Sequence, residues 1–311
     1  MSKLLIITGP TATGKTSLAL EIAKKYDGEI ISADSRQVYK YMDIGTGKDV
    51  SNSKFKVQNS KLGDLAMGYY EVDGVKIWGL DIVKPDRQFS VSDWVNYTNK
   101  IIKDIWRRGR LPVIVGGTGQ YIKELLRPSE TLHIPPNREL RIMNYELSEL
   151  QNKLQEINLG KWEKMNYSDK NNPRRLVRAI EVSLFRHPGG SETTDRISKK
   201  ILSPFGLQND ILIIGLSAPR EFLNERIDRR VEQRIAAGME KERDFLKKYR
   251  LPKTLGYNGE GAQEWKIAEH QYAKRQMDYL QKFLPETVWF DISVSDWQRN
   301  LWPVIQKFLN I

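Results

Sequence analysis

The segment GPTATGKT, residues 9–16, has the residue types and spacing of a phosphate-binding loop. Its two glycines, lysine and final threonine fit the P-loop pattern G-x-x-x-x-G-K-[ST], in which backbone N–H groups surround two phosphates. The threonine hydroxyl can bind Mg²⁺, so we predict Thr16 as a metal ligand. The predicted diphosphate or nucleotide site comprises Gly9, Pro10, Thr11, Ala12, Thr13, Gly14, Lys15 and Thr16. The alternative interpretation is a glycine-rich turn that only resembles this pattern.

A carboxylate follows the second apolar segment of the chain, EIISA at residues 29–33. In a doubly wound sheet, ligands bind outside the carboxyl ends of the strands, so we expect Asp34 to face the same crevice as Lys15 and Thr16. A carboxylate there can hold Mg²⁺ or accept a proton from an incoming nucleophile. It can equally cap the next helical turn, a common role for Asp after a strand, and the spacing leaves both interpretations open.

Another apolar segment, LPVIV at residues 111–115, continues into GGTGQY rather than into an acidic residue. ATPases and GTPases usually place an aspartate after such a strand to hold Mg²⁺. The missing acid argues against a motor or switch NTPase. It favours a transferase, in which the phosphates belong to a reacting small molecule.

Three arginines, Arg174, Arg175 and Arg178, follow Pro173 at the predicted start of a helix, and Arg141 lies upstream. Positive side chains are unfavourable at a helix N-terminus, because the helix dipole already places partial positive charge there. Contact with a phosphate backbone would use such a cluster. A solvated basic helix face is the other interpretation.

The elements that must position these residues alternate between strand and helix. Their expected order is strand 4–8, helix 17–26, strand 29–34, helix 92–108 and strand 111–115. This alternation predicts an α/β fold of the P-loop NTPase type, with a parallel sheet core and helices on both faces. The apolar run ILIIGLS at residues 211–217 returns the chain to the sheet, and only helices are expected after it.

The pattern becomes helical between residues 129 and 204. Apolar residues recur at a spacing of three and four over residues 138–157, and a second helix is expected from Pro173 through LVRAIEVSLF. The two could pack as a hairpin. We therefore predict a catalytic core of residues 1–128 and 205–311, and a helical insertion domain of residues 129–204.

Composition excludes several classes of site. The 311 residues contain no cysteine, which excludes disulfides, a thiolate nucleophile and a cysteine-type zinc site, and the three histidines are far apart. No apolar run approaches the roughly 20 residues that cross a bilayer, so we expect a cytoplasmic protein without membrane contact. By default we also expect a monomer. The formal net charge of +11 suits a polyanionic partner such as nucleic acid.

Seven segments together resemble the tRNA dimethylallyltransferases, also called tRNA isopentenyltransferases, of bacterial type. They arrive in the family's order and span nearly the whole chain. These segments are GPTATGKT (9–16), ISADSRQVYKYMDIGTGK (31–48), VGGTGQYI (115–122), NNPRRLVRAIEV (171–182), APREFLNERIDRRVEQRIAAGMEKE (218–242), LGYNGE (255–260) and YAKRQMDYL (272–280).

The resemblance implies transfer of a dimethylallyl group from dimethylallyl diphosphate to N6 of the adenosine 3′-adjacent to the anticodon, in tRNAs that read codons beginning with U. The P-loop would then hold a diphosphate leaving group. Such a reaction needs no activated water, which would explain the missing acid. Lys15, and Mg²⁺ bound to Thr16, would neutralise charge on the departing diphosphate.

The catalytic residues that the resemblance implies are Asp34, Thr118, Lys15 and Arg220. Asp34 would accept a proton from the adenine amine or hydrogen-bond to it, and Arg220 is similar to a family arginine that reaches the diphosphate. Thr118 would bind the bridging oxygen or position Asp34. Its alternative role is that of a small residue required by a tight Gly-Gly turn.

The resemblance also implies a site for the anticodon stem-loop of tRNA, from which the target adenosine must turn out of its stack. The residues implied for it are Asp34, Ser35, Arg36, Gln37, Thr118, Arg141, Arg174, Arg175, Leu176, Val177 and Arg178. Those from residue 141 onward would belong to the insertion domain, which we expect to clamp the tRNA.

Two segments depart from the family pattern. Asn258 and Gly259 stand where relatives commonly carry a charged residue and a glutamate, and residues 49–77 form a longer, more hydrophilic link than expected. Three other functions stay open: an adenylate dimethylallyltransferase acting on AMP, ADP or ATP, a P-loop small-molecule kinase, and a non-enzymatic RNA-binding protein. The first should not need an insertion with an arginine cluster, whereas the second should carry an arginine-rich lid.

Overall fold

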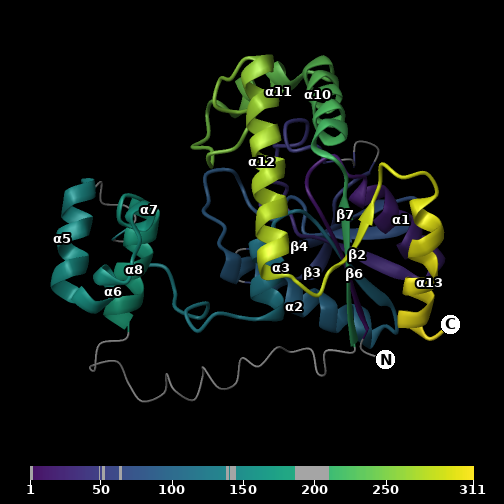
Figure 1. Cartoon of the computed structure of the whole chain (residues 1–311), viewed down its shortest axis with the longest axis horizontal. Coiled ribbons are helices and arrows are strands. Elements are labelled where there is room, and N and C mark those ends of the chain that lie inside the picture. Colours follow the sequence, from purple (N-terminus) through teal and green to yellow (C-terminus); the bar gives the residue numbers. More distant parts are fainter. Residues whose placement is uncertain are drawn as a thin grey trace. The chain divides into compact units, whose positions relative to one another are not determined.

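The computed structural model describes residues 3–48, 50, 53–62, 65–137, 140, 145–185 and 210–311. The chain divides into two compact units, Met1–Leu126 with Phe205–Ile311, and Arg127–Pro204 (Figure 1). The boundaries expected from the sequence lay after residues 128 and 204.

The first unit is built on an eight-stranded sheet in the order β3-β4-β5-β2-β6-β1-β7-β8. Its strands are β1 (Leu4–Thr8), β2 (Gly28–Ser32), β3 (Lys56–Leu62), β4 (Leu65–Val72), β5 (Val75–Trp78), β6 (Leu111–Val115), β7 (Ile211–Ser217) and β8 (Val288–Asp291). All neighbours from β5 to β8 in this order pair in parallel, whereas β3, β4 and β5 pair antiparallel. The predicted α/β fold with a parallel sheet core is confirmed.

Helices cover both faces of this sheet. In Figure 1, α1 (Lys15–Lys25) and α13 (Trp297–Leu309) lie on one side, and α2 (Val91–Arg107), α3 (Gly119–Leu126) and α12 (Ala262–Phe283) lie on the other. Every residue of β1 is buried, as expected for a parallel strand with both faces covered. Since β1 and β2 both pair in parallel with β6, the carboxyl ends of these three strands lie at one edge of the sheet.

Two parts of the sheet differ from the sequence prediction. Helices alone were expected after β7, but VWFD forms β8 and pairs in parallel with β7. β8 has only four residues, of which Phe290 alone is buried, so its sequence shows too little apolar pattern for a strand to be predicted there. Within residues 49–77, β3 and β4 form an antiparallel hairpin that widens the sheet beyond β5.

The second unit is helical. Its helices are α5 (Leu147–Ile157), α6 (Leu159–Glu163), α7 (Tyr167–Lys170) and α8 (Pro173–Phe185). Leu150 and Leu154 of α5 pack with Leu176 and Ile180 of α8 in a small apolar core. The predicted second helix matches α8, whereas α5 covers only the last part of the helix expected over residues 138–157. Residues 138–139 and 141–144 of that prediction lie outside the described residues.

Candidate active site

A cavity of about 880 Å³ lies at the carboxyl edge of the parallel strands. The P-loop, the turn after β2, the loop of residues 43–48, α10 (Arg220–Ala236) and α12 supply its walls. Seven basic side chains line it, namely Lys15, Arg36, Lys48, Arg226, Arg229, Arg230 and Arg234, against three acidic ones, Asp34, Asp43 and Glu269. This excess of positive charge favours an anionic ligand.

The P-loop backbone is shaped by its glycines. Gly9 has φ +140°, and a Cβ on it would lie 2.3 Å from the Leu216 carbonyl oxygen, so only glycine lets the loop pass β7. Gly14 has φ +81° and begins α1, whose unpaired N–H groups then point toward the cavity. Of the eight predicted residues, five line the cavity: Thr11, Ala12, Gly14, Lys15 and Thr16. The other three support the loop from behind, as the 2.9 Å hydrogen bond from Thr13 Oγ1 to Pro10 O illustrates.

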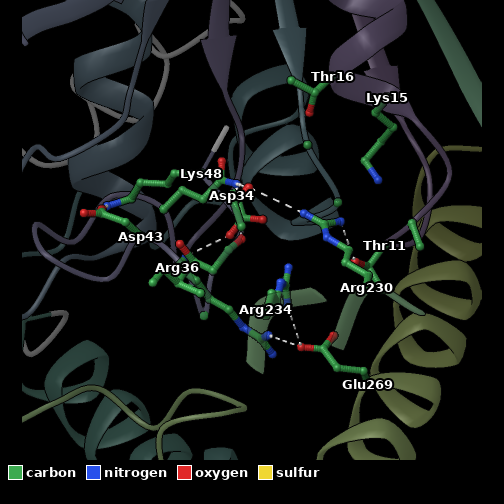
Figure 2. A pocket seen from close by; sticks show the side chains of 18 of the residues that line it. Thr11, Lys15, Thr16, Asp34, Arg36, Asp43, Lys48, Arg230, Arg234 and Glu269 are labelled. Carbon is green, nitrogen blue, oxygen red and sulfur yellow. Dashed lines mark hydrogen bonds and ion pairs between the residues drawn. The ribbon is translucent and has the colours of Figure 1, made fainter. Parts of the chain in front are cut away.

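The Lys15 amine is positioned to bind an anion. Its Nζ donates to Pro10 O at 2.6 Å, within the loop itself. Burial and the neighbouring Arg230 lower the pKa of Lys15 to about 7, and the negative charge of Asp34 opposes that shift. A bound phosphate would therefore favour the protonated amine. Figure 2 shows Lys15, Arg230 and Arg234 pointing toward the space that Asp34 also faces.

Asp34 both caps a turn and lines the cavity. Its Oδ1 accepts a hydrogen bond from Arg36 N–H at 2.8 Å, so the capping interpretation is correct for that oxygen. The carboxylate nevertheless lies in the wall of the cavity, on the edge opposite α10. The two roles left open by the sequence are thus compatible.

Thr118 holds this turn in place. Its Oγ1 accepts from Ser35 N–H at 3.1 Å, and its own N–H donates to Ala33 O at 3.2 Å. Neither Thr118 nor Ser35 is among the residues that line the cavity. These two hydrogen bonds agree with the positioning of Asp34, one of the three roles considered for Thr118, and the contact with the bridging oxygen stays a prediction.

Four arginines of α10 line the cavity, and none of them is among the site residues predicted from the sequence. Arg226 Nε donates to Ala12 O at 2.7 Å, and Arg230 Nη1 donates to Thr11 Oγ1 at 3.4 Å, so α10 is tied directly to the P-loop. Arg226, Arg230 and Arg234 recur every four residues, which places them on one helix face. That spacing was the signal in the sequence that could have identified them.

The structure does not place Arg220 in the cavity wall. Arg220 is the first residue of α10, is exposed, and is not among the lining residues. Arg226 stands almost two helical turns further along α10, and its side chain reaches the P-loop. The role of Arg220 at the diphosphate stays a prediction.

Arg36 is held by α12. Its guanidinium lies 4.1 Å from the centre of the Tyr272 ring and 3.4 Å from Glu269 Oε1. Glu269 also lies 3.7 Å from Nη1 of the buried Arg234, whose pKa is lowered to about 10 by burial and by Arg230. Gln37 also lines the cavity, and its amide donates to Thr46 O at 3.4 Å and Gly47 O at 3.3 Å.

The predicted tRNA contacts of the insertion lie in the second unit and have different environments. Arg174 and Arg175 are exposed, and Arg175 forms an ion pair with Asp169. Arg178 of α8 donates to Glu181 at 2.9 Å and to the carbonyl oxygens of Thr131 and Ile134. It therefore links the segment that contains Thr131 and Ile134 to α8.

Leu176 and Val177, which were also predicted to contact tRNA, are less exposed than Arg174 and Arg175. Leu176 is fully buried in the core of the second unit, so its side chain packs and cannot touch RNA; this part of the prediction is wrong. Val177 is partly buried against the same core. Arg141 lies outside the described residues.

Within the described part of the chain, no group of three or more His, Asp or Glu side chains could hold a metal ion by itself. The oxygen donors in the cavity wall near the P-loop are the Asp34 carboxylate and a few hydroxyls, among them that of the exposed Thr16. Such a sparse set fits Mg²⁺, which keeps several waters and completes its shell with substrate phosphates. No described helix is long and apolar enough to cross a membrane.

Comparison with known proteins finds relatives along the whole chain. A family profile described as IPP transferase matches residues 37–283, and one described as isopentenyl transferase matches residues 2–60. The chain is 32% identical to a tRNA dimethylallyltransferase of Leuconostoc mesenteroides, over 93% of each protein. It is 35% identical to the enzyme of that name in Acetivibrio thermocellus, over 91% of this chain and 90% of the relative.

Solved structures of similar fold carry related names. The tRNA isopentenylpyrophosphate transferase of Bacillus halodurans has a TM-score of 0.64 and 29% identity, and the match covers 100% of this chain and 97% of that one. A eukaryotic dimethylallyltransferase acting on tRNA has a TM-score of 0.74 over 99% of this chain and 80% of that one, and at 21% identity it shows likeness of fold alone. Since the first family profile spans well over half of its length, the chain belongs to the IPP transferase family.

Proposed function

We propose that this chain transfers a dimethylallyl group from dimethylallyl diphosphate to the exocyclic N6 of the adenosine 3′-adjacent to the anticodon, in tRNAs that read codons beginning with U. The relatives named as tRNA dimethylallyltransferases support the reaction class. One observation on this chain carries the proposal: the P-loop and the Asp34 carboxylate face each other across a cavity lined by the arginines of α10.

The donor half of the reaction uses this positive charge. The allylic C–O bond breaks and the electron pair leaves with the diphosphate, so negative charge grows on the departing group. Lys15, Arg226 and Arg230 stand around the P-loop and would stabilise it, as would the amides at the start of α1. Mg²⁺ bound through Thr16 would add further charge neutralisation.

The acceptor half uses the opposite wall. The new C–N bond places positive charge on N6 until its proton departs, and Asp34 is the acidic side chain on the turn that Thr118 and Ser35 hold. The carboxylate would accept that proton. The adenosine must leave its stack to reach the cavity, which costs a few kcal/mol that contacts elsewhere must offset. The exposed Arg174 and Arg175 would contribute phosphate contacts.

The test separates this reaction from its rivals. The protein is incubated with dimethylallyl diphosphate labelled in its prenyl group, or with γ-labelled ATP, and with an anticodon stem-loop RNA or AMP. Label should pass from the prenyl donor into the RNA only, and a stem-loop whose target adenosine is replaced by guanosine should stay unlabelled. Prenylation of AMP in preference to RNA, or transfer from ATP alone, would overturn the proposal.

A further inference from the structure

A group of three rings, two of them exposed, lies where the loop after β2 meets α11 (Met239–Leu246). The centre of the Tyr41 ring is 5.7 Å from that of Phe245, edge to face, and 5.9 Å from that of Tyr249, nearly parallel. We call these three residues the aromatic cluster. Tyr41 and Phe245 keep 40% and 47% of their surface exposed, so burial does not account for the rings being there.

Tyr41 also has an unfavourable backbone conformation. Its φ is +67°, in the left-handed region that glycine adopts most easily. The other non-glycine residues with positive φ in the described chain are four aspartates, one asparagine and one alanine, so Tyr41 alone is aromatic. A strained residue whose side chain is exposed points to a role other than folding.

The aromatic cluster is joined to the rim of the cavity. The Glu242 carboxylate of α11 accepts hydrogen bonds from the N–H groups of Asp43 at 3.0 Å, Ile44 at 2.7 Å and Gly45 at 3.0 Å. Asp43, Ile44 and Gly45 all line the cavity, and Tyr41 precedes the first of them by two residues. Tyr257 donates its hydroxyl proton to the same carboxylate at 2.5 Å. Tyr41 therefore stands on a braced loop next to the cavity.

Positive charge accompanies the rings. Lys248 Nζ lies 3.8 Å from the centre of the Phe245 ring and 5.4 Å from that of Tyr249, and Arg250 is exposed next to them in sequence. Proteins that bind single-stranded nucleic acid combine aromatic faces for bases with cations for phosphates. The net charge of +11 agrees with a polyanionic partner.

We propose that the aromatic cluster is a stacking surface for an unpaired anticodon-loop nucleotide beside the target adenosine, with Tyr41 as the residue that contacts the base. This inference rests on the proposed function, and it names a subsite of that same reaction. Turning out the target adenosine unstacks its neighbours. A neighbouring base that stacks on Tyr41 would recover part of that free energy.

The main test replaces Tyr41 by glycine, which removes the ring and relieves the backbone. Binding of an anticodon stem-loop RNA should weaken about 5- to 50-fold, the range expected when one stacked base loses its aromatic partner. Pyrophosphate affinity should not change, and the melting temperature should stay or rise. Tyr41→Phe should bind RNA as the wild type does. Asn310→Gly is the matched control, because Asn310 also has positive φ, at +62°, but lies beyond the last turn of α13.

Abasic RNAs then separate stacking from an effect on the fold. One abasic position in the loop should weaken binding to the wild type and show no further loss with Tyr41→Gly. If Tyr41→Gly binds the intact RNA normally, or if its loss is the same for every abasic RNA, the stacking proposal is overturned. If the wild type itself transfers no prenyl group to the stem-loop, it is the proposed function that fails.

Discussion

Gln276 and Thr11 are joined by a hydrogen bond of 2.9 Å from the Thr11 N–H to Gln276 Oε1. The same side chain donates from Nε2 to Gly117 O at 3.0 Å. One buried amide of α12 therefore connects the P-loop to the GGT turn that positions Asp34. The Gln276 side chain therefore supports both the diphosphate side and the Asp34 side of the cavity, although it lies far from both loops in sequence.

Replacing this brace should affect both halves of the site. Gln276→Leu leaves the Thr11 N–H and the Gly117 carbonyl without that partner, so pyrophosphate affinity should fall about 5- to 50-fold, the range for leaving a buried polar group unpaired. Isothermal titration measures this loss. Gln276→Glu keeps the acceptor for Thr11 but loses the donor for Gly117 and adds a negative charge to the cavity wall, so it should bind pyrophosphate at least as weakly as Gln276→Leu does. Equal affinity of all three proteins would contradict the bracing role.

Asp34 can be tested without disturbing its turn. Asparagine keeps an oxygen that can accept from Arg36 N–H but is no base, so Asp34→Asn should fold and bind RNA normally. The rate of prenyl transfer in a single turnover should fall ~100-fold or more, as when a positioned base is lost. Transfer at the wild-type rate would show that Asp34 only caps the turn.

The lowered pKa of Lys15 predicts a pH dependence of donor binding. Below its pKa of about 7 the amine is charged and attracts phosphate; as pH rises through that value the proton is lost, so pyrophosphate affinity should fall between pH 6 and 8.5. Since pyrophosphate itself titrates in this range, the comparison is with Lys15→Met, which lacks the titrating amine. Parallel pH profiles of the two proteins would exclude this origin.

The role predicted for Arg220 can be compared directly with that of the later arginines of α10. Arg226→Met and Arg230→Met should each weaken pyrophosphate binding about 10- to 100-fold, because hydrogen bonds to charged groups contribute about 1.5–3 kcal/mol. Arg220→Met removes the same charge from the start of the same helix and should change affinity less than twofold. A larger loss from Arg220→Met than from Arg230→Met would restore the original assignment.

The arginines of the second unit should act on the salt dependence of RNA binding. Arg174→Ala combined with Arg175→Ala should lower stem-loop affinity at low salt and reduce the slope of log K against log salt, because fewer counterions are released. Lys161→Ala with Lys164→Ala is a control of equal charge on the same unit. A slope unchanged by the arginine substitutions would remove them from the interface.

Local residue patterns account for the local parts of this protein. The P-loop, the buried strands and the start of α8 follow from neighbouring residues, because contiguous spacing sets backbone conformation and the face that is buried. The parallel α/β core was predictable for the same reason, since continuous apolar runs alternate with helical ones.

Which side chains come into contact depends on long-range packing. Ile235 continues the four-residue spacing of Leu223, Ile227 and Val231 on α10, yet it is 36% exposed and Arg234 is buried instead. Gln276 reaches Thr11 across 265 positions of the chain, and β8 exists only through its pairing with β7. Such contacts depend on how distant elements pack, and no local spacing encodes that geometry.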